Sequence, residues 1–144
     1  MEIKFVDYNS PLYSESLNLR DRVLRIPNGM SIYNDNLEGD QTDHHMVLIE
    51  NEQIVGCLVL SILDSSTLKM RQVAVEESKR GIGIGASLVA SAEKFAIEND
   101  YGKIVLNARK VVLGFYERLG YQSLGPEFIE VGIPHQKMEK QLFQ

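Results

Sequence analysis

The stretch Arg80-Gly81-Ile82-Gly83-Ile84-Gly85-Ala86 decides how this chain folds. It follows a strand-like segment that ends at Val75 and leads directly into an amphipathic, helix-like segment over residues 83–98. Glycines let a ligand approach the main chain closely, and the first turn of a helix leaves its N–H groups unpaired and attracts an anion. The sequence therefore predicts a bound phosphate where this helix begins, with Arg80 as a charged donor.

Two well-known kinds of phosphate-binding turn can be compared with this spacing of glycines. A nucleotide P-loop closes with Gly-Lys-Ser/Thr, whereas Gly85 is followed here by Ala86-Ser87, which excludes that class. The G-x-G-x-x-A pattern of a dinucleotide-binding turn is met by Gly81, Gly83 and Ala86.

Two features count against the dinucleotide-binding alternative. Residues 76–80 separate the strand from the glycines, which should follow it closely, and Asn107 stands near the position expected for the acidic ribose ligand. The remaining alternative is a plain strand-to-helix turn without a ligand, but such a turn rarely needs three alternating glycines and an arginine. Coenzyme A is the third ligand class that such a turn could bind.

At this point the sequence resembles the GNAT superfamily of acyl-CoA N-acyltransferases. The family motif R/Q-x-x-G-x-G/A is matched by Arg80, Gly83 and Gly85, and the strand over residues 71–75 matches the family's preceding strand. One departure is Glu76, which stands where many members have proline.

A second signature of the same family follows downstream in the expected order. Leu106-Asn107-Ala108 resembles its strand, and residues 114–121, Gly-Phe-Tyr-Glu-Arg-Leu-Gly-Tyr, resemble its F-Y-x-x-x-G-F/Y helix. The ending over residues 127–138 resembles a branch of small bacterial acetyltransferases. The resemblance thus covers essentially the whole chain and is most specific over residues 71–121.

The resemblance implies a mixed α/β fold in a single domain spanning residues 1–144. Its central sheet should be mostly antiparallel, flanked by helices, and split by a splayed parallel strand pair over residues 68–75 and 103–106. Local patterns agree with this fold. They predict further strands over residues 2–7, 46–49, 54–63 and from 121 onward, helices over 11–24 and 111–119, a hairpin turn over 50–53, and a loop with at most a short helical turn over 30–44.

The predicted strand over residues 68–75 carries an irregularity. Its apolar residues sit at Leu68 and Met70 and then at Val73 and Val75, so the inward face shifts by one residue near Arg71-Gln72. A β-bulge produces such a shift. We therefore expect a bulge at this point and expect Val73 and Val75 to face inward after it.

The resemblance also implies how acetyl-CoA is held as co-substrate. The main chain of the strand would pair with the pantetheine arm through Val73, Ala74 and Val75, and Asn107 would bind the arm or the adjoining backbone. The pyrophosphate would rest on Arg80, Gly81, Ile82, Gly83, Ile84, Gly85 and Ala86.

The implied reaction is direct attack of a primary amine on the thioester in a ternary complex, which makes the protein an N-acetyltransferase. Tyr116 would bind coenzyme A and protonate the leaving thiolate, because a phenol is protonated at neutral pH. Glu130 and His135 are predicted to act as base on the amine, with His45 and Glu50 as alternatives. Two other function classes stay open, a non-catalytic acyl-CoA sensor and an acyltransferase with another acyl donor.

The acceptor is not identified by the sequence. The same bacterial branch has an L-R-x-x-V-L-R-x-P string like residues 19–27, so Arg20 and Arg25 are candidate ligands of the acceptor, together with His45. A small-molecule amine is the expected acceptor and a protein amine the alternative. Homodimers are common in the superfamily, but no stripe of residues identifies an interface.

Composition limits the other partners. The net charge is -5, and no stripe of Lys and Arg offers a nucleic acid a basic surface. No apolar run is long enough to span a membrane, and the N-terminus lacks a signal-like segment, so we expect a cytoplasmic protein. The single cysteine, Cys57, lies in an apolar run and is expected to pack in the core. No metal is expected, because adjacent His44 and His45 would point to opposite faces of a strand.

Overall fold

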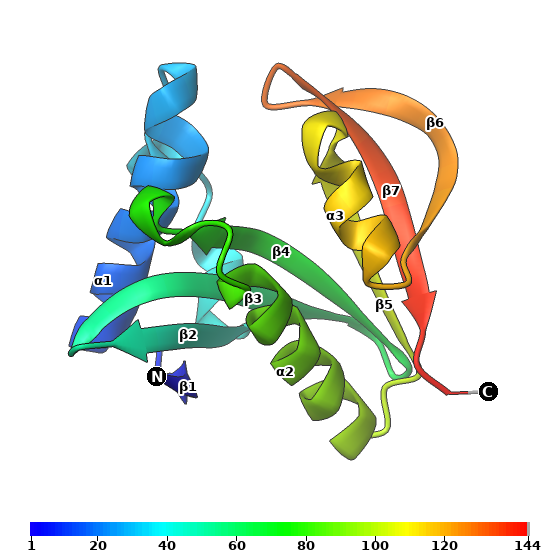
Figure 1. Cartoon of the computed structure of the whole chain (residues 1–144), viewed down its shortest axis with the longest axis horizontal. Helices are drawn as coiled ribbons and strands as arrows, with labels where there is room; N and C mark the ends of the chain where they lie inside the picture. The colour runs from blue at the N-terminus through cyan, green and yellow to red at the C-terminus, as the bar shows by residue number, and fades with distance from the viewer. Residues whose placement is uncertain (144) are drawn as a thin grey trace. The chain divides into compact units, whose positions relative to one another are not determined.

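A computed structural model describes residues 1–143 of the chain (Figure 1). Its seven strands form one sheet in the order β1-β2-β3-β4-β5-β7-β6. By contacts the chain divides into two compact units. The first comprises Met1–Ser61 and Met70–Ala92, and the second comprises Ile62–Lys69 and residues 93–143.

The first unit is built on an antiparallel meander. Strands β1 (Glu2–Val6), β2 (His44–Glu50) and β3 (Gln53–Asp64) pair in sequence order. Asn51 and Glu52 form the β2–β3 turn with φ of 51° and 66°, the left-handed pair that a two-residue hairpin requires. The predicted hairpin is confirmed.

Helix α1 (Pro11–Arg20) packs on this meander. Ser10 caps it by accepting a hydrogen bond from the Tyr13 N–H, and Pro11 occupies the first turn, where its missing N–H is not needed. A π-helical turn, Asp21–Arg25, and a 3-10 turn, Ile26–Asn28, continue it. The predicted helix over 11–24 is therefore found, but only its first part is α-helical.

Below α1 lies a small apolar core. Leu19 of α1 packs with Val47, Ile54, Cys57 and Ala74, all of them at most 5% exposed. Burial raises the pKa of the Cys57 thiol to about 12, so the sulfur stays protonated and serves as packing. The prediction for Cys57 is confirmed.

The loop before β2 contains more regular structure than its composition indicates. It holds two 3-10 turns, Ile32–Asn34 and Glu38–Gln41, where at most one turn was expected. Ser31 caps the first turn through the Tyr33 N–H, and Ile32 is fully buried in a second apolar cluster with Tyr13 and Leu17. Burial of Ile32 is one of the contacts that hold this polar segment in place.

Strand β4 (Thr67–Val75) carries the predicted irregularity. Gln72 has φ of 55°, the left-handed region, in the middle of the strand. After it Ala74 is the buried residue, 2% exposed, whereas Val73 and Val75 stay partly exposed. The expectation that Val73 and Val75 take over the inward face is wrong, because the small side chain of Ala74 is the one that packs in the core.

The second unit is a three-stranded antiparallel arrangement. Strand β7 (Ile133–Gln141) lies between β5 (Lys103–Arg109) and β6 (Gln122–Glu130). Helix α3 (Leu113–Arg118) follows β5 through the 3-10 turn Lys110–Val112 (Figure 1). This 3-10 turn replaces the first part of the helix predicted over 111–119.

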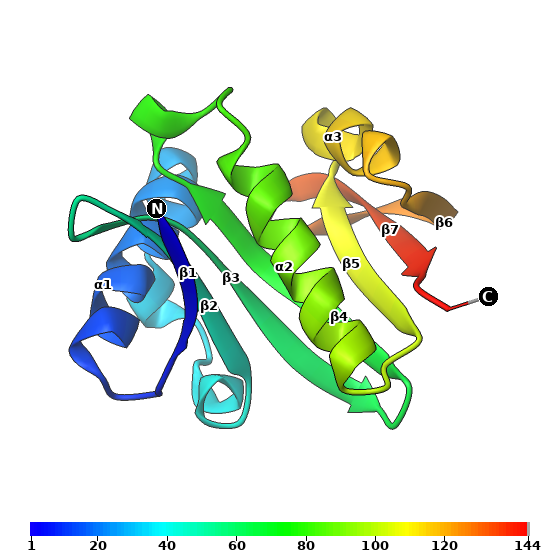
Figure 2. The same ribbon diagram turned by 60° about the horizontal axis from the view of Figure 1, so that its bottom comes forward.

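Helix α2 (Ile84–Glu98) leads from the glycine turn toward β5 (Figure 2). The strand pairs β1–β2, β2–β3, β5–β7 and β6–β7 are antiparallel, and the predicted mixed α/β fold class is confirmed. Within residues 1–143, no helix has both the length and the apolar character needed to cross a membrane.

Candidate active site

The glycine turn has the backbone that close approach of a phosphate requires. Gly81 and Gly83 have φ of 83° and 88°, and a Cβ added at either would meet no described atom within 4 Å. Residues 80–83 are exposed, and α2 begins immediately afterwards at Ile84, so N–H groups of its first turn have no intrahelical acceptor. This geometry fits an anion on the N-terminus of α2.

Arg80 is exposed at the start of the turn and donates from Nε to the Val75 carbonyl at 3.3 Å. Two ion pairs fix the residues just before it. Glu76 pairs with Arg22 at 2.8 Å, and Lys79 pairs with Glu50 at 2.8 Å. The approach to the turn is thus tied to the π-helical turn on one side and to β2 on the other.

Gly56 on β3 sets the position of α2, and sequence patterns alone did not identify it. A Cβ at this residue would lie 2.8 Å from Ile84 Cγ2 and 2.8 Å from Leu88 Cδ1. Both side chains are buried, at 3% and 0% exposure. Because only glycine leaves room for them, the N-terminal turn of α2 can lie directly on the strand.

A buried polar network lies beside the β4 irregularity. Arg20 is 2% exposed, and its Nη1 lies 2.9 Å from Asp40 Oδ2, while its Nε donates to Gln72 Oε1 at 3.1 Å. Tyr13 donates to the same Asp40 oxygen at 2.6 Å, and His45 Nε2 lies 2.8 Å from the Asp40 carbonyl. Arg20 and His45, both predicted to bind the acceptor, are therefore bonded inside the protein.

Charge governs the protonation of Asp40. Burial alone would raise its pKa, but hydrogen bonds from Tyr13 and Arg20 and the charge of Arg20 outweigh burial and lower the pKa below its ordinary value. For the Tyr13 hydroxyl, burial and the neighbouring carboxylate act together to raise the pKa. Asp40 is thus an anion and Tyr13 a donor at neutral pH.

Arg25, the other arginine predicted to bind the acceptor, is bonded to Asp35. Its Nη2 lies 2.8 Å from Asp35 Oδ2, and its Nε lies 3.2 Å from Oδ1. The Arg25 side chain is 9% exposed, so most of its surface is covered. Substrate binding by Arg20, Arg25 and His45 stays a prediction.

Tyr116 lies on α3 in the second unit and is 7% exposed. Its ring meets Phe115 and Tyr121 edge to face, at centroid distances of 4.9 Å and 5.8 Å. Burial raises the pKa of Tyr116 to about 12, so the phenol holds its proton at neutral pH. The sequence signature identified this residue, but only the structure shows the aromatic packing that orients it.

Glu130 and His135, predicted separately from the sequence, lie together at the β6–β7 hairpin. His135 Nε2 is 3.5 Å from Glu130 Oε2, and the histidine is 5% exposed. His135 Nδ1 lies 2.7 Å from the Ile133 carbonyl, which can only accept, so Nδ1 carries a proton. In the neutral ring Nε2 is then the basic nitrogen, and it faces the carboxylate. Phe128 stacks on the ring at 5.9 Å.

The other predicted site residues have less specific surroundings. Asn107 lies half-buried on β5 opposite Lys137 of β7. His44 and His45 point to opposite faces, as predicted, with His44 edge to face with Phe5 at 6.1 Å. In the part of the chain that the structure describes, no three His, Cys, Asp or Glu side chains gather in a way that would hold a metal ion.

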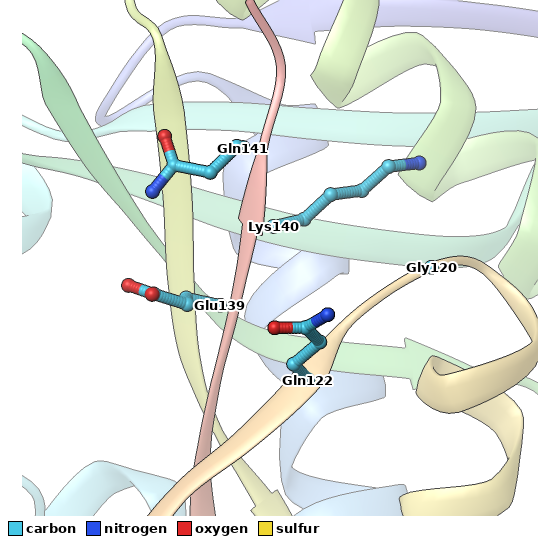
Figure 3. A pocket seen from close by; sticks show the side chains of 5 residues that line it. All are labelled: Gly120, Gln122, Glu139, Lys140 and Gln141. Atoms are coloured by element: carbon cyan, nitrogen blue, oxygen red, sulfur yellow. The ribbon is translucent and has the colours of Figure 1, made fainter. Parts of the chain in front are cut away.

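A pocket of about 220 Å³ opens in the second unit, lined by Gly120, Gln122, Glu139, Lys140 and Gln141 (Figure 3). None of these residues belongs to the predicted site. Lys140 is bonded there to Glu93 at 3.1 Å and to the Leu119 carbonyl at 2.8 Å. The pocket therefore contributes nothing to the chemistry considered above.

Comparison with known proteins identifies a family. The family model of the acetyltransferase (GNAT) domain matches residues 27–142. An uncharacterized N-acetyltransferase of Bacillus subtilis, YjcF, is 32% identical over 107 residues, which cover 74% of each protein. Escherichia coli ElaA aligns with a TM-score of 0.83 at 21% identity, covering 97% of this chain and 99% of that one.

A second solved structure was determined with a ligand. It is an aminoglycoside 6'-N-acetyltransferase complexed with coenzyme A, with a TM-score of 0.81 at 19% identity, covering 100% of this chain and 98% of that one. At these identities the two structures show a shared fold.

Proposed function

This chain belongs to the GNAT family of acetyltransferases, and we propose that it transfers an acetyl group from acetyl-CoA to a primary amine by direct attack in a ternary complex. The observation that carries the proposal is the glycine turn. Two left-handed glycines with open space above them stand at the start of α2, which is the arrangement a pyrophosphate needs. The aminoglycoside acetyltransferase of the same fold was solved with coenzyme A, which supports this assignment.

In this proposal the pyrophosphate of acetyl-CoA lies on the main chain of residues 80–86, and Arg80 turns from the Val75 carbonyl to the phosphate. The main chain of Val73, Ala74 and Val75 pairs with the pantetheine arm as an added strand. Val73 and Val75 are only partly buried, which supports this role. Asn107 is assigned to the arm by family resemblance.

Tyr116 acts on the leaving sulfur. With a pKa of about 12, the phenol is a weaker acid than a thiol of ordinary pKa, about 8.5, by roughly three-thousandfold. Complete transfer of its proton to a free thiolate is therefore uphill. We assign Tyr116 a hydrogen bond to the sulfur that strengthens as negative charge develops and the carbon–sulfur bond breaks, after which solvent supplies the thiol proton.

His135 takes the proton that the amine loses. In the neutral ring its Nε2 has a free electron pair that can accept this proton, and the Glu130 carboxylate lies 3.5 Å from it. The nitrogen–carbon bond forms as this proton leaves the amine, and the products are an amide and coenzyme A. Glu50, an alternative base, is already paired with Lys79. A small-molecule amine is the proposed acceptor, and a protein amine is the alternative.

The test combines binding and turnover on the purified protein. Calorimetry with acetyl-CoA measures binding, and a thiol-release assay against a library of primary amines measures transfer. The proposal predicts binding together with thiol release that depends on at least one amine. Binding without amine-dependent release across the library would favour an acyl-CoA sensor, and competition among acyl-CoAs would reveal another preferred donor.

A further inference from the structure

Gln72 holds an unusual backbone conformation for its place in the fold. Six residues other than glycine have positive φ among the described residues: Asn9, Asn51, Glu52, Gln72, Asp100 and Val131. The other five lie in turns or at element ends, whereas Gln72 lies inside β4. Any residue with a side chain disfavours positive φ, so contacts of Gln72 must hold its backbone in this conformation.

The contact that holds Gln72 comes from a buried arginine. Arg20 Nε donates to Gln72 Oε1 at 3.1 Å, and because a guanidinium has only donors, the oxygen of the amide must face it. Arg20 is held in turn by Asp40, which also binds Tyr13. Both charged side chains are at most 3% exposed, so neither can swing into solvent.

The network reaches β4 at a second point. Arg71, the residue before Gln72, lies 3.6 Å from Asp40 Oδ1 and 2.9 Å from Asp43 Oδ2, and its Nε donates to Ser61 at 3.0 Å. Two successive residues of the strand are thus attached to one buried carboxylate, directly or through Arg20. Ordinary strand pairing imposes an extended backbone, so by itself it would not give residues 71 and 72 the orientations that they have here.

We propose that the Arg20–Asp40 pair is a positioning device, which fixes the left-handed turn at Gln72 and thereby aims the main chain of Val73 at the acyl-CoA. The proposal rests on the function proposed above, in which this main chain binds the pantetheine arm. Arg20 and Gln72 are then positioning residues that do not touch the substrate. Arg20, predicted from the sequence to bind the acceptor, acts through the strand instead.

The test compares the affinities of coenzyme A and adenosine 3',5'-diphosphate, which lacks the pantetheine arm and the phosphate that carries it. In Gln72→Met the side chain keeps its length but cannot accept from Arg20, whereas in Gln72→Glu it can. We expect Gln72→Met to lower the affinity for coenzyme A about tenfold, which is the effect of losing one hydrogen bond to a charged group. The affinity for the diphosphate should not change. We expect Gln72→Glu to keep the affinity for coenzyme A within about twofold, because the carboxylate still accepts the hydrogen bond from Arg20.

Arg20→Met leaves Asp40 as an unpaired buried charge and can fail to fold, so the half-buried Gln72 carries the test. Lys140→Met, which breaks the Lys140–Glu93 pair of the second unit, is the matched control and should leave both affinities unchanged. Unchanged coenzyme A affinity in Gln72→Met, or an equal loss for both ligands, would overturn the inference. A wild-type protein that does not prefer coenzyme A to the diphosphate would instead contradict the proposed function.

Discussion

At the scale of single residues, burial keeps Tyr116 protonated and orients it. Its pKa of about 12 keeps the phenol protonated at neutral pH, and the rings of Phe115 and Tyr121 fix its plane. The residue can therefore donate a hydrogen bond at neutral pH. Its effect on rate is expected to come from position, because its acidity is weaker than that of free tyrosine.

Tyr116→Phe removes the donor while keeping the aromatic packing. We expect turnover to fall about a hundredfold, the lower range for loss of a hydrogen-bond donor to charge that develops in the transition state, while the affinity for acetyl-CoA stays the same. Steady-state kinetics and calorimetry measure the two. Tyr121→Phe is the matched control, since it removes a buried hydroxyl bonded to Glu93 at 2.9 Å and should lower stability without lowering turnover. Unchanged turnover in Tyr116→Phe would remove this residue from the mechanism.

Asp40 is expected to make stability depend on acid pH. Because its pKa is lower in the folded than in the unfolded chain, it stabilises the fold above the unfolded value of about 3.9, and this contribution is lost as the pH falls toward the folded value. Urea unfolding should show wild type more stable than Asp40→Asn by a constant amount from pH 7 to about 5, and the difference should shrink below about pH 4. Glu98→Gln on α2 is the exposed control. A difference that grows at acid pH would contradict the assigned charge.

At the scale of elements, the start of α2 joins the two features that a coenzyme A site needs. The glycine turn gives access to the main chain, and Gly56 on the neighbouring strand lets the helix lie close to the sheet. Neither Gly83 nor Gly56 could be replaced by a larger residue without a local change in the structure, and the reasons differ. At Gly83 the backbone is left-handed, whereas at Gly56 the space is filled.

Gly83→Ala tests the turn. Alanine disfavours φ of 88°, at a cost of about 1–2 kcal/mol, and places a methyl group where the phosphate should lie. We expect coenzyme A to bind at least about tenfold more weakly, because the methyl group hinders the phosphate and a loss of about 1.4 kcal/mol in binding free energy corresponds to tenfold. Gly29→Ala is matched to it, because Gly29 has φ of 72° and open space as well, and should cost similar stability without loss of affinity. Equal affinities in the two variants would argue against a phosphate at this turn.

Gly56→Ala tests the support beneath the turn. The added methyl group would lie 2.8 Å from Ile84 and Leu88, so α2 must shift or its side chains must repack. Overpacking of this kind destabilises by about 1–3 kcal/mol, which denaturant unfolding measures. Gly39→Ala is the control, because the nearest atom to its Cβ is an Asp43 oxygen at an ordinary 3.6 Å. An equal effect of the two substitutions would show that Gly56 does not limit the packing of α2.

At the scale of the whole molecule, the parts predicted from sequence are those that local patterns encode. The glycine turn, the hairpin at Asn51 and the irregularity at Gln72 follow from spacing and periodicity over a few residues. Tyr116 and the Glu130–His135 pair were identified through family resemblance, and the structure shows the latter two in contact.

Contacts between distant parts of the sequence could not be predicted in this way. Arg20 and Gln72 are 52 residues apart, and nothing near either one indicates the other. The carboxylate of Asp40 lies in a polar loop whose composition hides its burial. Gly56 resembles any glycine in an apolar strand until the buried Ile84 and Leu88 are placed above it. Long-range packing decides all three, and a single sequence does not display it.

Acetyl transfer itself is tested most directly by following a labelled acetyl group. Acetyl-CoA carrying ¹³C in the acetyl group is incubated with the wild-type protein and the amine library, and mass spectrometry follows the label while free thiol is measured. Direct acetyl transfer predicts a labelled amide and an equal amount of free coenzyme A, with both reduced together in Tyr116→Phe. Acetyl-CoA that binds and stays intact in the presence of every amine, or thiol release without a labelled amide, would contradict it.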